Sequence, residues 1–140
     1  MGIEMVPYFV DTSAFYAAKD PSDQHHAQAV AFMESVRRNL SLRLVTSNFI
    51  LDETLTLVRM KLGHETAVRF GHQIRESRIV EVIHITEALE ERAWQIFQKY
   101  SDKKYSFTDC TSFAVMEGLS VWDAFTFDRH FGAHGFVMHP

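Results

Sequence analysis

The sequence predicts an α/β protein with a mainly parallel central sheet that helices cover on both faces, a three-layer α/β/α arrangement. Short apolar segments typical of strands alternate along the chain with longer segments whose apolar residues recur at helical spacing. This alternation indicates βαβ crossovers, which join parallel strands. The chain has 140 residues, a length that suits one core, and no repeat or linker interrupts the pattern. We therefore expect a single domain over residues 1–140.

Local signals place the elements of the first half of the chain. We expect a strand at 6–10, a helix at 22–39, a strand at 42–46 and helices at 47–62 and 65–77. Apolar residues between Ala27 and Val36 form one face of the first helix. Ser47 can cap the next helix with its side-chain oxygen, and Gly63 is a suitable residue to end it.

The second half continues the same alternation. We expect a strand at 79–85, helices at 87–100 and 106–117, a strand at 121–127, a short turn of helix at 128–133 and a last strand at 135–139. Thr86 can cap the first of these helices, with the negative charge of Glu87 in its first turn. Ser106 opens the second helix, and we expect Gly118 to end it.

Composition and charge exclude several classes of protein. The chain is 46% hydrophobic and 23% charged, so neither a disordered nor a fibrous protein is indicated. A net charge of −4 argues against a general nucleic-acid coat protein but not against a nuclease, because clustered carboxylates would account for it. Cys110 is the only cysteine, which suits a reducing cytoplasm. No signal peptide or membrane span is recognisable, so we expect a cytoplasmic protein with no membrane partner.

Four carboxylates lie within or at the end of apolar segments, namely Asp11, Glu53, Asp109 and Asp128. An isolated ionised carboxylate is costly in an apolar setting, so such a group neutralises, pairs or binds a cation. Mg²⁺ or Mn²⁺ would be the simplest shared partner, because hard divalent cations prefer oxygen ligands. Asp11 and Asp128 directly follow predicted strands, and ligands of parallel sheets lie beyond the carboxyl ends of the strands. These acids therefore suggest a metal-dependent enzyme that cleaves phosphodiester bonds.

Helical spacing separates Glu53 from its neighbour Asp52. The apolar arc of the 47–62 helix comprises Phe49, Ile50, Leu57 and Met60. At about 100° per residue, Glu53 falls in the middle of this arc, whereas Asp52 lies on the side of Arg59. We therefore expect Glu53 to point inward and Asp52 to be solvated. The alternative is that Glu53 lies at the edge of the arc and extends to water.

Asp11, Thr12 and Ser13 form the most specific local feature. A strand that ends in an acid followed by two hydroxyl residues provides one metal ligand and two donors for a phosphate or a water molecule. The alternative is that Asp11 is an ordinary N-cap of a short helix at 13–18. We favour the metal-ligand interpretation.

The two remaining acids also have structural explanations. Ser106 and Asp109 fit a capping box, in which the acid accepts a hydrogen bond from the backbone of the cap residue. Asp109 also lies on the same arc as Phe113, so it can cap the helix and face a cation at once. Asp128 could instead cap a turn and pair with Arg129.

The histidines and the cysteine suggest other chemistry. His130 and His134 are four residues apart, a spacing that could bind zinc on a helix. Gly132 and Gly135 argue against a sustained helix there, and no third ligand is evident, so we favour surface or core roles for these histidines. Cys110 lies in an apolar helix, where a small packing residue is expected rather than a nucleophile.

Taken in order, the motifs FVDTSAFYA, TSNFILDETLTLVR, YSFTDCTSFAVM and DAFTFDRHF resemble those of PIN-domain nucleases, in particular the toxin ribonucleases of VapBC toxin–antitoxin modules. The resemblance covers essentially the whole chain and implies a PIN-like fold. It implies that Asp11, Glu53 and Asp109 are metal ligands, with Asp128 as the more variable fourth acid. It also implies that Ser13 is the hydroxyl residue that assists the site.

The same resemblance implies the reaction and the partners. Such an enzyme would cleave RNA with Mg²⁺ or Mn²⁺ by means of a cation-activated water molecule, as the toxin of a toxin–antitoxin pair. An antitoxin would lie across the acidic groove, and a homodimer is expected. Phe15, Tyr16 and Trp122 could form a dimer surface, although we expect each of them to pack in the core.

Two alternatives belong to other classes of function. The first is a PIN-fold domain that binds a partner or RNA without catalysis. The second is a phosphoacceptor or phosphohydrolase whose nucleophile is the strand-end Asp11. The second is disfavoured because the sequence Asp11-Thr12-Ser13 lacks the second acid of a DxD phosphatase.

Overall fold

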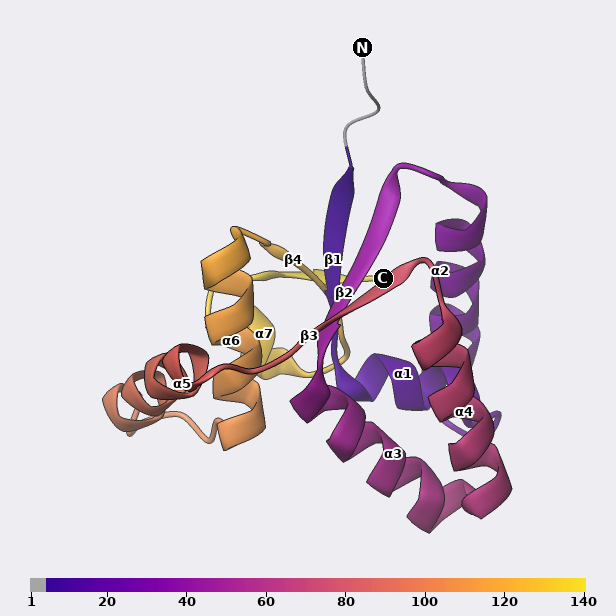
Figure 1. The fold of residues 1–140 in the computed structure, drawn as a ribbon, viewed down its shortest axis with the longest axis horizontal. Coiled ribbons are helices and arrows are strands. Elements are labelled where there is room, and N and C mark those ends of the chain that lie inside the picture. Colours follow the sequence, from indigo (N-terminus) through magenta and orange to yellow (C-terminus); the bar gives the residue numbers. More distant parts are fainter. Residues whose placement is uncertain (1–4) are drawn as a thin grey trace.

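The computed structural model describes residues 5–140 and contains, within that range, five strands and seven helices (Figure 1). In chain order they are β1 (Val6–Val10), α1 (Thr12–Lys19), α2 (His26–Arg38), β2 (Leu42–Ser47), α3 (Asn48–Leu62), α4 (His64–Glu76), β3 (Val80–Ile83), α5 (Glu87–Lys99), α6 (Phe107–Leu119), β4 (Asp123–Phe125), α7 (Arg129–Ala133) and β5 (Val137–His139). The strands form one parallel sheet in the order β3-β2-β1-β4-β5. The predicted α/β class and parallel sheet are confirmed.

Alternate residues of β1 identify the two helical layers. Successive side chains of a strand point to opposite faces of its sheet. The ring of Tyr8 lies 5.4 Å from that of Phe32 on α2, whereas the ring of Phe9 lies 6.3 Å from that of Phe131 on α7. Helices α5, α6 and α7 therefore cover one face, and α1, α2 and α4 cover the other (Figure 1).

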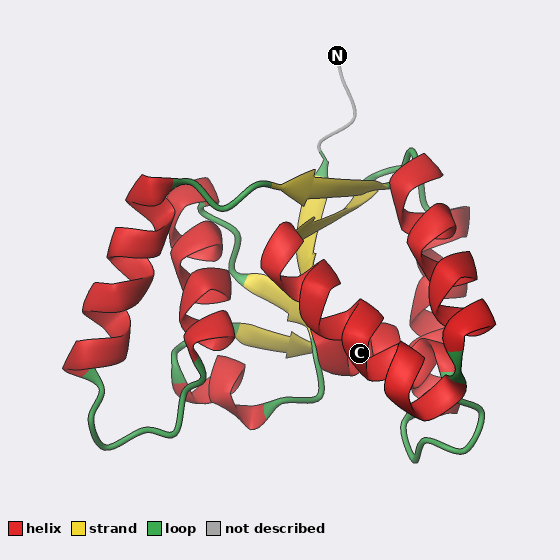
Figure 2. Cartoon of the chain, turned by 60° about the horizontal axis from the view of Figure 1, so that its bottom comes forward, coloured by secondary structure: helices red, strands yellow, loops and turns green. Residues whose placement is uncertain are grey.

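Hydroxyl caps begin three helices where the sequence predicted them. The side chains of Ser47, Thr86 and Ser106 accept hydrogen bonds from backbone N–H groups in the first turns of α3, α5 and α6. Each cap satisfies a donor that the helix itself leaves free. Because these caps fix where α3 and α6 start, they also fix the first-turn residues near the carboxyl ends of the strands. Figure 2 turns this end of the sheet toward the viewer.

Two boundaries of the predicted helices differ from the prediction by two residues or more. Helix α2 begins at His26 rather than Ser22, because residues 20–25 form turns in which Asp20 and Asp23 accept backbone hydrogen bonds. Helix α6 continues through Gly118 to Leu119 and ends at Ser120, which has a φ of 55°. The N–H of Val121 then donates to the carbonyl of Met116 (2.9 Å), a bond that closes the turn while Val121 becomes buried.

The core is aromatic on the side of the sheet that faces α6 and α7. Phe9, Phe113 and Phe131 are fully buried, and the rings of Phe113 and Phe131 meet edge to face at 5.1 Å. Cys110 is also fully buried, which supports its expected packing role. In the described part of the chain, every buried side-chain nitrogen or oxygen atom has a hydrogen-bond partner. No helix among those residues is long and apolar enough to cross a bilayer.

Candidate functional site

Three of the four predicted carboxylates gather where β1 and β4 end. Asp11 follows β1 and caps α1, Asp128 follows the β4 segment and caps α7, and Asp109 lies in the first turn of α6. The negative charges of Asp109 and Asp128 both act on Asp11. The position is the carboxyl edge of a parallel sheet, where ligands of such sheets bind.

Asp11 is the buried member of the group, with only 4% of its surface exposed. Its Oδ2 atom accepts hydrogen bonds from the hydroxyl groups of Ser13 (2.9 Å) and Thr126 (3.0 Å). Burial raises the pKa of Asp11 to about 6; the two hydroxyl donors oppose this rise, and the charges of Asp109 and Asp128 add to it. The carboxylate therefore carries its charge in a setting that disfavours it.

Ser13 and Thr126 join the end of β1 to the segment that follows β4. The hydroxyl of Ser13 donates to Asp11 and accepts a hydrogen bond from the backbone N–H of Phe127 at 2.9 Å. The hydroxyl of Thr126 donates to Asp11 and accepts from the backbone N–H of Asp128 at 3.0 Å. Two hydroxyl groups thus fix the relative positions of Asp11 and Asp128.

Asp109 both caps its helix and faces the acidic group. Its side chain accepts from the backbone N–H of Ser106 (3.0 Å), and its own N–H donates to the hydroxyl of Ser106 (2.9 Å), so the predicted capping box is confirmed. Burial raises the pKa of Asp109, as does the charge of Asp128, whereas Ser106 and His130 lower it. Capping and a role in a site are therefore compatible at this residue.

His130 is the residue whose place the sequence did not predict. Its Nδ1 atom lies 3.3 Å from Oδ2 of Asp109 and 3.4 Å from Oδ1 of Asp128. Asp128 also accepts a hydrogen bond from the backbone N–H of His130 (2.9 Å), so its partner is His130 and not Arg129. One oxygen each from Asp109 and Asp128 and one nitrogen of His130 all lie within 4.8 Å of one another, a donor set that suits a metal ion.

His134 does not join His130. Its ring stacks on that of Phe113 with centroids 4.4 Å apart, and its Nδ1 lies 3.2 Å from the hydroxyl of Tyr105. Burial lowers the pKa of His134, against the opposing effect of Glu117. The core role that we favoured for His134 agrees with this position. The signal for His130 was its place two residues after Asp128, not its spacing from His134.

Glu53 does not point inward as predicted. It is exposed, like its neighbour Asp52, and Met60 of the predicted apolar arc is 79% exposed. The buried residues of α3 are Ile50, Thr54 and Val58. The hydroxyl of Thr54 donates to that of Thr12 at 3.3 Å, so Thr54 belongs to the face of α3 that packs against α1, and Glu53 lies beside that face. Glu53 is therefore a surface residue next to the contact that joins α3 to the start of α1.

Among the aromatic residues, Phe15 and Tyr16 are buried as expected, but Trp122 is 55% exposed, so its predicted place in the core is wrong. Trp122 lies just before β4, and its backbone carbonyl accepts a hydrogen bond from the backbone N–H of Val137. The indole is partly covered by the ring of Phe136, 5.8 Å away, and the rest of it faces solvent.

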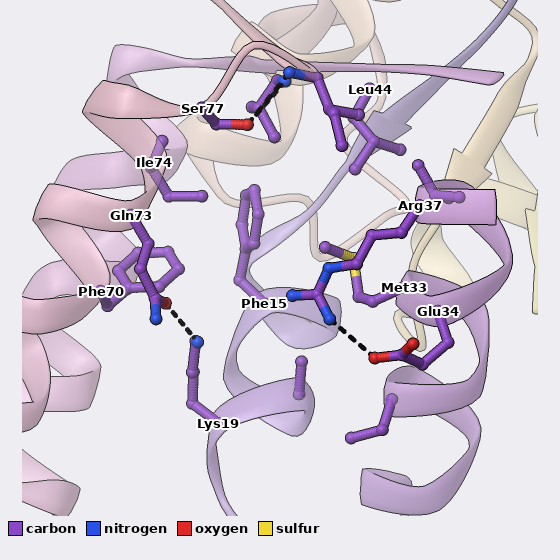
Figure 3. A pocket seen from close by; sticks show the side chains of 15 residues that line it. Phe15, Lys19, Met33, Glu34, Arg37, Leu44, Phe70, Gln73, Ile74 and Ser77 are labelled. Carbon is purple, nitrogen blue, oxygen red and sulfur yellow. Dashed lines mark hydrogen bonds and ion pairs between the residues drawn. The ribbon is translucent and has the colours of Figure 1, made fainter. Parts of the chain in front are cut away.

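A cavity of about 330 Å³ with both apolar and charged residues in its lining lies elsewhere, between α1, α2, α4 and the β2–β3 side of the sheet (Figure 3). Phe15, Met33 and Phe70 line it, and the ion pair of Arg37 with Glu34 stands at its rim. None of the four predicted acids contributes to its lining. The cavity is therefore separate from the acidic group.

Comparison with known proteins identifies the family. The family model of the PIN domain matches residues 8–137. This chain is a PIN-domain protein. It is 40% identical over 129 residues to VapC20 of Mycobacterium tuberculosis, a 23S rRNA-specific endonuclease. The aligned residues cover 92% of this chain and 95% of that relative. It is also 32% identical over 113 residues to a VapC ribonuclease of Archaeoglobus fulgidus, covering 80% of this chain and 71% of that one.

Solved structures share the fold of this chain. The crystal structure of M. tuberculosis VapC20, a sarcin–ricin loop cleaving toxin, matches this PIN domain with a TM-score of 0.87 over 95% of this chain and 99% of that one. VapBC2 of Rickettsia felis, bound to a DNA fragment from its promoter, matches with a TM-score of 0.72 at 12% identity over 96% and 98% of the two chains, which shows the fold alone. The resemblance to VapC-type PIN domains is confirmed.

Proposed function

We propose that this PIN-domain protein is a metal-dependent endoribonuclease and the toxin of a toxin–antitoxin pair. The observation that carries the proposal is the convergence of Asp11, Asp109 and Asp128 from separate parts of the chain at the carboxyl edge of the sheet. The 40% identity to VapC20 over 92% of this chain supports the same activity.

The residues at this edge fit a divalent cation. Burial and mutual repulsion raise the pKa of both Asp11 and Asp109, so a positive charge among them would offset an electrostatic cost. Oxygen atoms predominate among the donors, which favours Mg²⁺ or Mn²⁺. We propose Asp11, Asp109 and Asp128 as ligands. Glu53 is proposed as a fourth ligand that acts from the exposed margin of the site.

Each residue of the site has a separate task under this proposal. When bound, a divalent cation activates water and stabilises the charge that develops on the phosphate. Ser13 orients Asp11, because its hydroxyl is fixed from the other side by the N–H of Phe127. Ser106 holds Asp109 through the capping box. The hydroxyl of Thr126 keeps Asp11 and Asp128 in register.

We propose RNA as the substrate and a protein antitoxin as the partner. VapC20 acts on 23S rRNA at the sarcin–ricin loop, so a stem-loop of that kind is the first substrate to test. The family resemblance implies that the antitoxin lies across this acidic group, and a basic side chain of the antitoxin would be attracted to the three carboxylates. Co-expression with the adjacent open reading frame tests the partner: growth should be rescued, and failure to rescue would contradict it.

We also propose a homodimer that acts in the cytoplasm. The rings of Trp94 and Phe97 stack 5.8 Å apart on α5, and these residues are 46% and 42% exposed. Exposed apolar surface of this kind is typical of a contact with another protein. Light scattering of the purified chain measures its mass directly, and a monomer at micromolar concentration would contradict the dimer.

The activity is tested by mapping the cut ends of an RNA stem-loop digested with Mn²⁺, with Mg²⁺ and with EDTA. Cleavage should require a cation and disappear in Asp11→Asn. Asp52→Asn is the matched control, because Asp52 is an exposed acid on α3 and not among the proposed ligands. A folded Asp11→Asn protein with full activity would contradict the proposed site.

A further inference from the structure

We infer that His130 contributes a nitrogen ligand to the cation site at Asp109 and Asp128, and that this site therefore binds Mn²⁺ in preference to Mg²⁺. This role rests on the metal-dependent function proposed above and extends it. The motifs that indicate the family account for carboxylate ligands alone, so the imidazole adds a donor of a different chemical type.

The distances suit coordination. Around an octahedral ion with bonds of about 2.1 Å, neighbouring ligand atoms lie about 3.0 Å apart. Nδ1 of His130 lies 3.3 Å from the nearest oxygen of Asp109 and 3.4 Å from that of Asp128. All three atoms lie within 4.8 Å of one another, which is close enough for the three side chains to be ligands of one ion.

The protein holds the imidazole in this position. The backbone N–H of His130 donates to Asp128 at 2.9 Å, which fixes the start of α7. The ring of Tyr105 meets the ring of His130 edge to face at 5.4 Å, and Tyr105 is itself buried against Phe113. The side chain of His130 is 36% exposed, so an ion can reach it from solvent. Packing on one side and access on the other are what a metal ligand requires.

The donor types predict the choice of ion. Mg²⁺ binds oxygen almost exclusively, whereas imidazole is a good ligand for transition-metal ions, and Mn²⁺ accepts both carboxylate and imidazole. Loss of His130 should therefore weaken Mn²⁺ binding by about tenfold or more and Mg²⁺ binding by much less. A histidine that only donates a hydrogen bond to Asp109 would affect the two ions alike.

The test is electron spin-echo envelope modulation of Mn²⁺ bound to the full chain, with calorimetric titration of Mn²⁺ and Mg²⁺. The wild-type spectrum should contain coupling to ¹⁴N, and labelling with [¹⁵N]histidine should change that coupling. His130→Gln should lose it, with the drop in Mn²⁺ affinity given above. The control His72→Gln removes an exposed histidine of α4 and should keep both the coupling and the affinity.

The outcomes separate the two proposals. Bound Mn²⁺ without nitrogen coupling, or coupling that persists in folded His130→Gln, overturns the role of His130 and leaves the nuclease proposal intact if RNA is still cleaved. Absence of Mn²⁺ binding overturns both. If His130→Gln does not fold, the labelled wild-type spectrum decides, because histidine coupling supports the ligand and its absence overturns it.

Discussion

Replacing Asp11 by asparagine should stabilise the fold at neutral pH while it abolishes activity. Asp11 is 4% exposed, and burial raises its pKa from 3.8 to about 6. At about 1.4 kcal/mol per pH unit, this interval corresponds to roughly 3 kcal/mol of stability that the ionised carboxylate removes from the folded state. Asparagine keeps an oxygen for the hydroxyls of Ser13 and Thr126 but makes weaker hydrogen bonds, so we expect a net gain of about 2 kcal/mol.

The pH dependence of this gain follows from proton binding. Because the pKa of Asp11 is higher in the folded than in the unfolded chain, the folded state holds its proton to a higher pH. The free energy of unfolding therefore falls as the pH rises from about 4 to about 6, and the loss is complete above that range. The advantage of Asp11→Asn should be near zero at pH 4 and reach its full value at pH 7.5.

Urea unfolding of both proteins in EDTA, at steps between pH 4 and pH 7.5, measures this difference. Around 2 kcal/mol corresponds to a rise of about 6 °C in the thermal midpoint for a chain of this length. Saturating Mn²⁺ should reduce the difference, since it stabilises only a site with all its ligands. If Asp11→Asn were destabilised by the same amount at pH 4 and at pH 7.5, the inference that the ionised Asp11 destabilises the folded state would be refuted.

Three further predictions concern the rest of the site. Glu53→Gln should reduce RNA cleavage at least about tenfold, whereas Asp52→Asn on the same exposed helix surface should not; equal rates for the two variants would remove Glu53 from the site. Ser106→Ala and Thr86→Ala should each lower the free energy of unfolding by about 1 kcal/mol in urea, because each variant removes one helix cap. Only Ser106→Ala should also weaken Mn²⁺ binding in calorimetry. Equal Mn²⁺ affinity in the two variants would contradict the positioning of Asp109 by its capping box. Adding Mn²⁺ at a hundredfold excess over its Kd should stabilise the wild type by about 2.7 kcal/mol, and an unchanged thermal midpoint would argue against the cation site.

The features that the sequence predicted are those that neighbouring residues determine. Ser47, Thr86 and Ser106 were identifiable as caps because a hydroxyl side chain satisfies backbone groups within three residues of itself. The position of Asp11 followed from the end of the first strand. Asp109 was identified as a cap from its spacing to Ser106, and as a member of the acidic group because it lies on the same helical arc as Phe113.

The features that it did not predict depend on contacts between distant segments. Gly118 failed to end α6 because burial of Val121 sets the turn at Ser120 instead. The direction of Glu53 depends on which face of α3 packs against the rest of the fold, and that face contains Ile50, Thr54 and Val58. Helical periodicity gives the width of an apolar face but not its centre when polar residues such as Thr54 are buried within it.

The place of His130 shows how packing builds the site. Residues 109 and 130 lie on different helices, and the edge-to-face contact of Phe113 with Phe131 holds α6 against α7. His130 and Phe131 are neighbours on the five-residue helix α7, so one side chain reaches the acids while the next enters the core. The spacing of residues 128 and 130 indicates that His130 lies near Asp128, but it could not have indicated that His130 also reaches Asp109 on another helix.

The acidic group and the aromatic core therefore depend on the same elements of the fold. Keeping Asp11 ionised at neutral pH costs roughly 3 kcal/mol, and burial of a single phenylalanine contributes about 1.5–3 kcal/mol. Phe9, Phe113 and Phe131, all fully buried, lie on the elements that carry Asp11, Asp109 and Asp128 to the edge of the sheet. Burial of these phenylalanines therefore offsets the cost of the ionised Asp11. Substitutions in this aromatic group should alter the geometry of the acids as well as the stability of the fold.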